Sequence, residues 1–305
     1  MSDSKVPPST SPRHILSRLT QLTSTLPGLD ASLMLAQYSS PLVVAILFKL
    51  ASFRTRHPRV RISSGAGKRT LIVDGGLGFA RLAEGWGRAA ASVGDARVVM
   101  RAFGLLPMLQ WLLSLHPKPM LALKSLLFSG NIVKLFRSKK TIPTLQALAI
   151  ILYYPLEHIS WLGSKGVVHL SPAKLAMASL WSVRFWALYV MLEIYKLRNT
   201  YRGLCARTRI LKQTRPVTTA QAGGYDLQSE KEATNDKQTW IAEKQELEKD
   251  RQKFKLQALT NSGYAPLTIH WSTPGGLWSN PLITGSFGSV AAIGSLLTEW
   301  SKYGA

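Results

Sequence analysis

The chain has 305 residues and 46% of them are hydrophobic, yet 38 Lys and Arg against 16 Asp and Glu give it a formal net charge of +22. This hydrophobic content excludes disorder for most of the chain, and a single cysteine, Cys205, excludes a disulfide scaffold. A strongly basic chain attracts polyanions, either nucleic acid or an anionic membrane, and the apolar excess favours the membrane.

The N-terminal segment is polar and rich in Ser and Pro, so we expect residues 1–29 to be disordered. It does not resemble a signal peptide, because no apolar stretch with a cleavage site follows a basic start. Residues 31–48 are uncharged and predict a buried or membrane-associated helix, interrupted near Pro41.

Residues 70–93 are apolar at a helical period, which predicts an amphipathic helix. Five glycines weaken it, by roughly 1 kcal/mol each relative to Ala, so we expect this helix to form only when another surface covers its apolar face. That surface is either the protein's own core or a membrane interface. The expected membrane-inserting face consists of Ile72, Phe79, Leu82, Trp86 and Val93.

A basic run with no acidic residue, from Lys49 to Arg69, precedes this helix. Basic clusters next to membrane helices attract anionic lipid, by about 1 kcal/mol per residue near the surface. The residues that we expect to contact anionic lipid are Arg54, Arg56, Arg59, Arg61, Lys68 and Arg69.

Four further apolar stretches predict helices at 98–115, broken by Pro107, and at 120–136, 142–162 and 173–197. Residues 97–225 hold 18 basic and only two acidic residues, and the basic residues cluster at the helix ends. RNA-binding proteins usually interleave basic residues with exposed aromatics, whereas these aromatics lie inside apolar helices, so we do not expect nucleic acid as a partner.

The segment from 198 to 265 differs in composition, because both charges are dense in it and residues 216–236 resemble a linker. It is predicted to be a charged cytosolic insertion.

The C-terminal segment carries the clearest membrane signal. Residues 256–298 contain no Asp, Glu, Lys or Arg, and Trp278 and Trp300 bracket the apolar helix that begins at Pro281. The two tryptophans lie about 33 Å apart along a helix, close to the roughly 30 Å of a bilayer core. We therefore expect a spanning helix with Trp278 and Trp300 as interfacial anchors.

This helix also carries a stripe of small residues, which lets two membrane helices approach closely. The stripe marks self-association, packing on another span, or only the usual abundance of small residues in such helices. It consists of Gly285, Gly288, Ser289, Ala292 and Ser295.

Enzyme motifs fail on inspection. Gly67-Lys68 lacks the earlier glycine and the following Ser or Thr of a phosphate-binding loop, and Arg81 stands where a dinucleotide fingerprint needs its third glycine. The six histidines show no metal spacing. We expect no catalytic residue, metal or cofactor, and we interpret Glu157 and His158 as a helix-packing pair, with Glu157 meeting a base such as Arg184, or else as a proton relay.

Several runs resemble the peroxisomal biogenesis factor 11 family, particularly its fungal C-type branch. In chain order the matching runs are Gln37–Ser40, Asp95–Trp111, Leu152–Gly163, Ser179–Tyr189 and Leu267–Trp271. Two features depart from the family pattern, namely the many glycines of residues 70–93 and the charged segment 216–260.

The resemblance implies a protein of the peroxisomal membrane that promotes peroxisome elongation and division. It also implies insertion of amphipathic helices into the cytosolic leaflet, self-association, and work with a dynamin-related GTPase and its membrane adaptor. Some members have been proposed to form pores.

We therefore predict an all-α, membrane-associated protein with amphipathic helices and a C-terminal transmembrane helix. Its expected parts are a disordered segment 1–29, a helical membrane domain 30–197, the insertion 198–265 and an anchoring segment 266–305. Its expected function is remodelling of the peroxisomal membrane without catalysis, with anionic lipids as partners. The alternative is a pore or transport component with a path lined by Glu157, His158 and Arg184.

Overall fold

The computed structural model describes residues 11–65, 68–74, 76–118, 124, 128, 139–214 and 227–303. The predicted stretch 120–136, apart from residues 124 and 128, and the linker residues 216–226 lie outside these residues. The helices are α1 (Pro12–Ser24), α2 (Leu26–Arg56), α3 (Leu77–Leu115), α6 (Thr141–Ser164), α7 (Pro172–Gln213), α8 (Leu227–Ser272), α9 (Pro281–Trp300) and the short η1 (Ser301–Tyr303). The expected all-α architecture is confirmed, with one addition, an antiparallel hairpin of β1 (Arg59–Gly65) and β2 (Lys68–Asp74).

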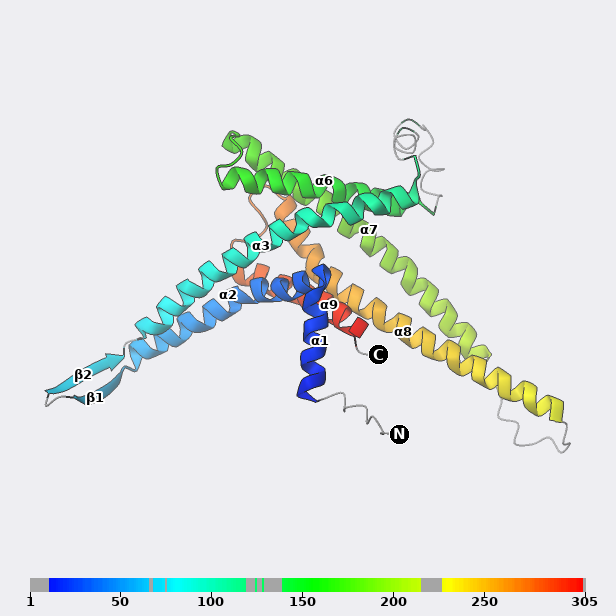
Figure 1. Cartoon of the computed structure of the whole chain (residues 1–305), viewed down its shortest axis with the longest axis horizontal. Helices are drawn as coiled ribbons and strands as arrows, with labels where there is room; N and C mark the ends of the chain where they lie inside the picture. The colour runs from blue at the N-terminus through cyan, green and yellow to red at the C-terminus, as the bar shows by residue number, and fades with distance from the viewer. Residues whose placement is uncertain are drawn as a thin grey trace, which may run out of the picture.

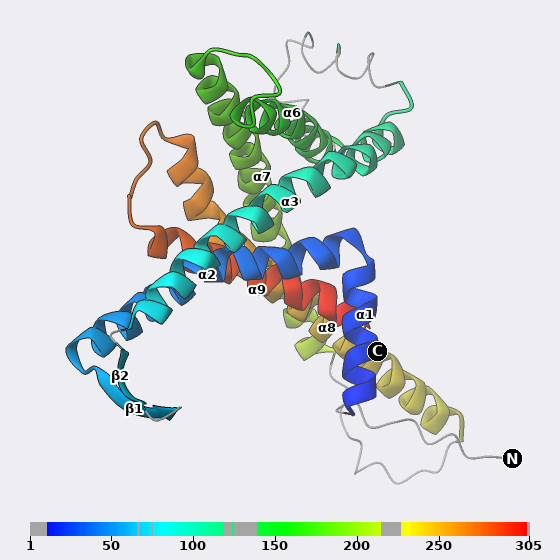
Figure 2. The same cartoon turned by 60° about the vertical axis from the view of Figure 1, so that its left-hand side comes forward.

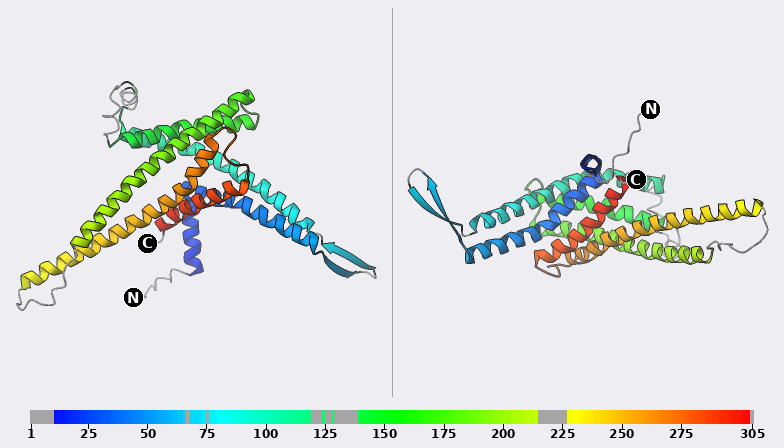
Figure 3. Two further views of the ribbon diagram at one scale, coloured as in Figure 1. Left: turned by 180° about the vertical axis from the view of Figure 1, so that it is seen from behind. Right: turned by 90° about the horizontal axis from the view of Figure 1, so that it is seen from below.

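Two long helix pairs diverge from a central region (Figure 1). α2 and α3 form one arm, which ends in the hairpin, and α7 and α8 form the other. α6 packs on α3 and α7, and α9 lies between α2 and α8, as the view from below shows (Figure 3).

Polar caps and prolines set the starts of four helices. Ser11, Thr25, Ser171 and Asn280 each accept a backbone N–H of the first turn, and a proline occupies the first or second position of each helix. The expected disorder of residues 1–29 is therefore wrong from residue 12 onward, because α1 and the start of α2 occupy this segment.

The predicted breaks at Pro41 and Pro107 are also wrong, because α2 and α3 continue through these residues. A proline inside a helix costs roughly 3 kcal/mol, so packing must offset it. At Pro41 the ring lies against α9, where a Cβ added to Gly285 would meet its side chain at 3.2 Å.

The predicted amphipathic helix begins later than expected. Residues 68–74 pair with 59–65, so that Ile72 stands opposite Arg61 in a strand. Gly76 has a φ of +82°, a left-handed conformation that suits glycine and separates the strand from α3. Ile72 therefore does not belong to the predicted helical face. It lies in strand β2, whose β-branched residues favour strand pairing.

The charged segment continues two helices of the membrane domain. The predicted boundaries near 198 and 265 fall inside α7 and α8, which run side by side to the end of their arm (Figure 1). Arg207 on α7 pairs with Asp250 on α8 at 2.6 Å, and the Trp240 indole donates to the Leu211 carbonyl at 2.9 Å.

Close backbone contacts hold α9 in the centre. A Cβ on Gly263 of α8 would collide with the backbone of α9, and a Cβ on Gly294 would meet the α8 backbone at Thr260. Met34 of α2 and Ala291 and Ala292 of α9 form a buried cluster there.

Candidate functional site

Among the described residues, four helices are by length and composition able to cross a membrane: Leu26–Arg56, Leu77–Leu115, Pro172–Gln213 and Pro281–Tyr303. The predicted C-terminal helix is among them. Trp278 lies just before α9, where its ring stacks on His270 with 4.0 Å between centroids, and Trp300 is its last residue. The two predicted anchors thus stand at the two ends of α9.

The small-residue stripe of α9 is covered within the chain. Gly285, Gly288, Ser289 and Ala292 are buried, and Ser295 is half-buried. A Cβ on Gly288 would collide with the ring of Tyr38 on α2. The stripe therefore serves packing on another candidate span, as one of the three sequence interpretations has it.

The predicted inserting face of α3 is only partly covered by α2. Ala83, on the same side, is buried, while Phe79 and Val93 are half-buried. Leu82 is 52% exposed and Trp86 44% exposed, although the Trp86 indole donates to the Ser40 hydroxyl at 3.1 Å. Only the edge formed by Leu82 and Trp86 remains open.

A second apolar face, on α1, was missed by the sequence analysis. α1 turns sharply away from α2 (Figure 2), and its Ile15, Leu16 and Leu19 side chains are exposed. Arg18 fixes the helix to the C-terminal end of α9, because its guanidinium donates to the Trp300 carbonyl at 3.0 Å and lies 4.1 Å from the Trp300 ring centroid. The signal was present in the sequence as Ser11-Pro12 followed by apolar residues at helical spacing.

The predicted lipid-contacting residues gather at one end of the molecule. Arg54 and Arg56 lie in the last turn of α2, and the other four, Arg59, Arg61, Lys68 and Arg69, lie in the hairpin strands that follow. The antiparallel pairing brings the two strands' basic residues to the same arm tip, beyond the apolar part of α2.

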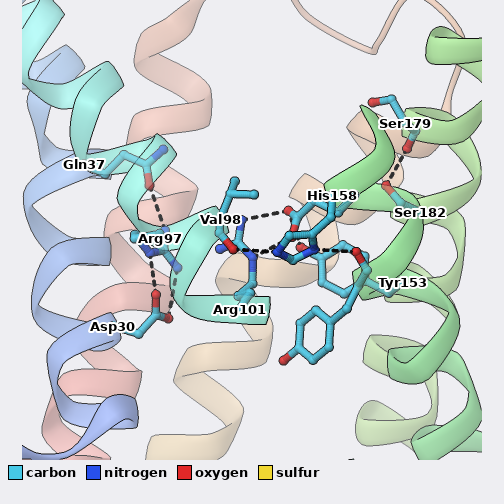
Figure 4. Close-up of polar contacts among 11 residues, drawn as sticks. Asp30, Gln37, Arg97, Val98, Arg101, Tyr153, His158, Ser179 and Ser182 are labelled. Carbon is cyan, nitrogen blue, oxygen red and sulfur yellow. Dashed lines mark hydrogen bonds and ion pairs between the residues drawn. The ribbon is translucent and has the colours of Figure 1, made fainter. Parts of the chain in front are cut away.

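Two arginines tie α3 to its neighbours (Figure 4). Arg97 donates to both carboxylate oxygens of Asp30 on α2, at 2.8 and 3.2 Å, and to the Gln37 amide oxygen at 2.8 Å. Arg101, one turn later, donates to both oxygens of Glu157 on α6 at 2.7 Å. Bidentate pairs of this kind fix geometry as well as charge.

The expected partner of Glu157 is therefore wrong. Arg184 lies over the ring of Trp181 at 5.1 Å instead, because α3 and not α7 presents a guanidinium to Glu157. The Tyr153 hydroxyl also donates to Glu157, at 2.7 Å, and burial raises the pKa of Tyr153 well above its usual value.

His158 joins α6 to α3 by a different contact. Its two ring nitrogens face the carbonyls of Tyr154 and Val98, at 2.6 and 2.9 Å. Carbonyl oxygens can only accept hydrogen bonds. A neutral imidazole therefore donates to one of these two carbonyls, and only an imidazolium donates to both. The packing interpretation of this pair agrees with these contacts.

A cavity of about 620 Å³ lies beside the two ion pairs. Glu157 lines it, but the other two residues of the expected path, His158 and Arg184, do not. Each of the five runs that carry the family resemblance contributes to the wall, through Gln37 and Tyr38, Arg97 and Arg101, Tyr153 and Tyr154, Ser179 and Trp186, and Trp271.

No group of three or more His, Cys, Asp or Glu side chains that could hold a metal ion lies within the described ranges. What the described site offers is charge neutralisation and close packing between apolar helices.

Comparison with known proteins identifies the family of the chain. The family model for peroxisomal biogenesis factor 11 matches residues 80–300. Human peroxisomal membrane protein 11C is 26% identical over 163 residues, which are 52% of this chain and 57% of that protein, so the chain matches only a little over half of the relative's length. No solved structure matches. The chain belongs to the peroxisomal biogenesis factor 11 family, and it is a protein of the peroxisomal membrane.

Proposed function

We propose that this protein remodels and elongates the peroxisomal membrane by inserting apolar helix faces into one leaflet. The observation that carries the proposal is the exposure of Ile15, Leu16 and Leu19 on α1, together with the open edge of α3 at Leu82 and Trp86. An amphipathic helix in one leaflet enlarges the area of that leaflet and favours curvature.

Both exposed apolar faces are anchored to neighbouring helices. Arg18 holds α1 against the end of α9, and Arg97 holds α3 against α2. The basic tip of the α2–α3 arm would keep the inserted faces at anionic headgroups. No step in this mechanism needs catalysis.

The test uses the purified full-length chain and vesicles of phosphatidylcholine with phosphatidylserine. We expect Leu19→Asp to abolish tubulation. Ser17→Asp, an exposed position about 160° from Leu19 around α1, should preserve it. Trp86→Asp should reduce tubulation, whereas Ser92→Asp, about 120° away on α3, should not. Equal effects of apolar-face and control variants would overturn the proposal.

The cavity supports a second candidate, a pore or transport component. About 620 Å³ of space lined by Asp30, Arg97, Arg101 and Glu157 lies between candidate spans. Ionisable groups between membrane helices often mark solute paths. Planar-bilayer conductance that changes on Glu157→Gln would support this function, and a bilayer without conductance would leave remodelling as the better account.

Self-association and work with a dynamin-related GTPase and its adaptor are part of the proposal. Because α2 covers the small-residue stripe of α9, a second copy would bind elsewhere. Crosslinking of differently tagged copies in peroxisomes tests this, and recovery of only single copies would remove self-association from the mechanism.

A further inference from the structure

An apolar groove runs along the α2–α3 arm. It has a volume of about 610 Å³, and its wall is almost entirely apolar. The α2 side carries Pro41, Val44, Ala45 and Phe48, the α3 side carries Gly87, Ala90 and Ala91, and residues 280–282 close one end.

The glycine-rich composition of α3 explains why this groove exists. A Cβ added to Gly87 would meet no atom within 4 Å, so the missing side chain leaves open space. Ala90 and Ala91, one turn further on, are also too small to reach α2 across it. Glycine weakens a helix by roughly 1 kcal/mol relative to Ala, and here it leaves the space open.

The groove continues into a basic end. A second depression of about 520 Å³ shares Ala45 and Phe48 with the groove and adds Lys49, Ser52, Phe53 and Arg56. Lys49 and Arg56 are exposed, and neither forms an ion pair with a carboxylate among the described residues. Pro41 lies about 12 Å from Lys49 and about 22 Å from Arg56 along the helix.

We infer that this groove holds one anionic phospholipid, with an acyl chain between α2 and α3 and the phosphate at Lys49 and Arg56. Half of a bilayer's hydrocarbon core is about 15 Å thick, so an acyl chain that starts at the cations would end near Pro41. Lys49 and Arg56, which meet no carboxylate within the described ranges, complement the charge of a phosphate, and the protein's membrane supplies the lipid. The inference does not depend on membrane remodelling.

The experiment measures lipid bound to the full chain in detergent by native mass spectrometry. The probes are phosphatidylserine and phosphatidylcholine with identical acyl chains, supplied at equal concentration. We expect one bound phosphatidylserine per chain, preferred over phosphatidylcholine by about tenfold. Both lipids carry a phosphate, but the choline cation neutralises it in phosphatidylcholine, whereas phosphatidylserine keeps a net negative charge that two nearby cations favour.

Matched variants separate the groove from general lipid adhesion. Gly87→Leu should fill the groove and lower the bound fraction at least fivefold. Gly85→Leu, on the same helix and outside the groove, should bind as the unmodified chain does. The double variant Lys49→Gln with Arg56→Gln should lose the preference for phosphatidylserine. The control pair Arg202→Gln with Arg209→Gln, exposed on α7 in the other arm, should keep it.

The inference is overturned if the unmodified chain shows no preference for phosphatidylserine, or if Gly87→Leu and Gly85→Leu bind alike. Circular dichroism checks the helical content of each variant. If Gly87→Leu fails to fold, the double variant Lys49→Gln with Arg56→Gln tests the inference alone, because both side chains are exposed. Vesicle tubulation is a separate readout, so loss of tubulation with intact lipid binding would reject only the proposed function.

Discussion

Arg97 and Arg101 show how single side chains position a long helix. They lie one turn apart on α3, and each forms a bidentate pair with a different helix. The side chain of Arg97 is only 8% exposed, so its charge depends on Asp30 for compensation. Removing one partner of such a pair leaves an uncompensated charge, which costs more than the pair itself contributes.

We predict that Arg97→Met lowers the free energy of unfolding by about 3 kcal/mol. Asp30 and Gln37 would lose their common donor, and α2 would loosen from α3. Denaturation of the full chain in mixed detergent micelles measures this change. Arg88→Met, an exposed arginine on the same helix, is the control and should change stability by less than about 0.5 kcal/mol. Equal losses would contradict this role of Arg97.

At the scale of elements, long apolar runs with clear ends were readable from the sequence. The stretches 142–162, 173–197 and 281–298 correspond to α6, the first part of α7, and α9. The errors arose where tertiary packing overrides local preference, as at Pro41, or where a short amphipathic helix lies in polar surroundings, as α1 does. The hairpin was missed because the alternating residues before Gly75 also fit a helical period.

The ion pairs of the site show why sequence alone could not predict the rest. Arg97 pairs with a residue 67 positions away, and Arg101 with one 56 positions away. Acidic residues are scarce in this part of the sequence, so Glu157 was an evident candidate for an ion pair. Only helix packing decides whether Arg101 or Arg184 reaches it. The basic run was visible in the sequence, whereas the groove beside it depends on the spacing of two helices.

The contact between α8 and α9 gives a prediction at this scale. Gly263→Ala should destabilise the protein by about 1–3 kcal/mol, because its Cβ would collide with the backbone at Phe287 and Ala291, which cannot move freely. Gly203→Ala on α7 should instead stabilise by about 0.5–1 kcal/mol, since its Cβ meets open space. Thermal unfolding in detergent measures both, and a neutral Gly263→Ala would show that the two helices are less tightly packed.

For the whole molecule, basic residues lie towards the ends of both arms. One arm ends with Arg54, Arg56 and the basic hairpin, and the other carries Arg202, Arg207 and Arg209 of α7. Both arms slope toward the same side of the molecule in two views (Figures 1 and 2). Basic segments favour the cytosolic side of a membrane, so one orientation satisfies both arms at once.

We therefore predict that both arm tips lie in the cytosol. The half-buried Cys205 is the chain's only cysteine, so a membrane-impermeant maleimide reports its side directly. Cys205 should be labelled in intact peroxisomes, and so should Ser63→Cys in the hairpin when Cys205 is replaced by Ser. Ile293→Cys in the same background is the control, because it lies within the apolar helix α9 and should stay unlabelled. If one of the two tips is labelled only after the membrane is permeabilised, the two arms lie on opposite faces of the membrane. The shared slope of the arms would then have no role in orienting the protein.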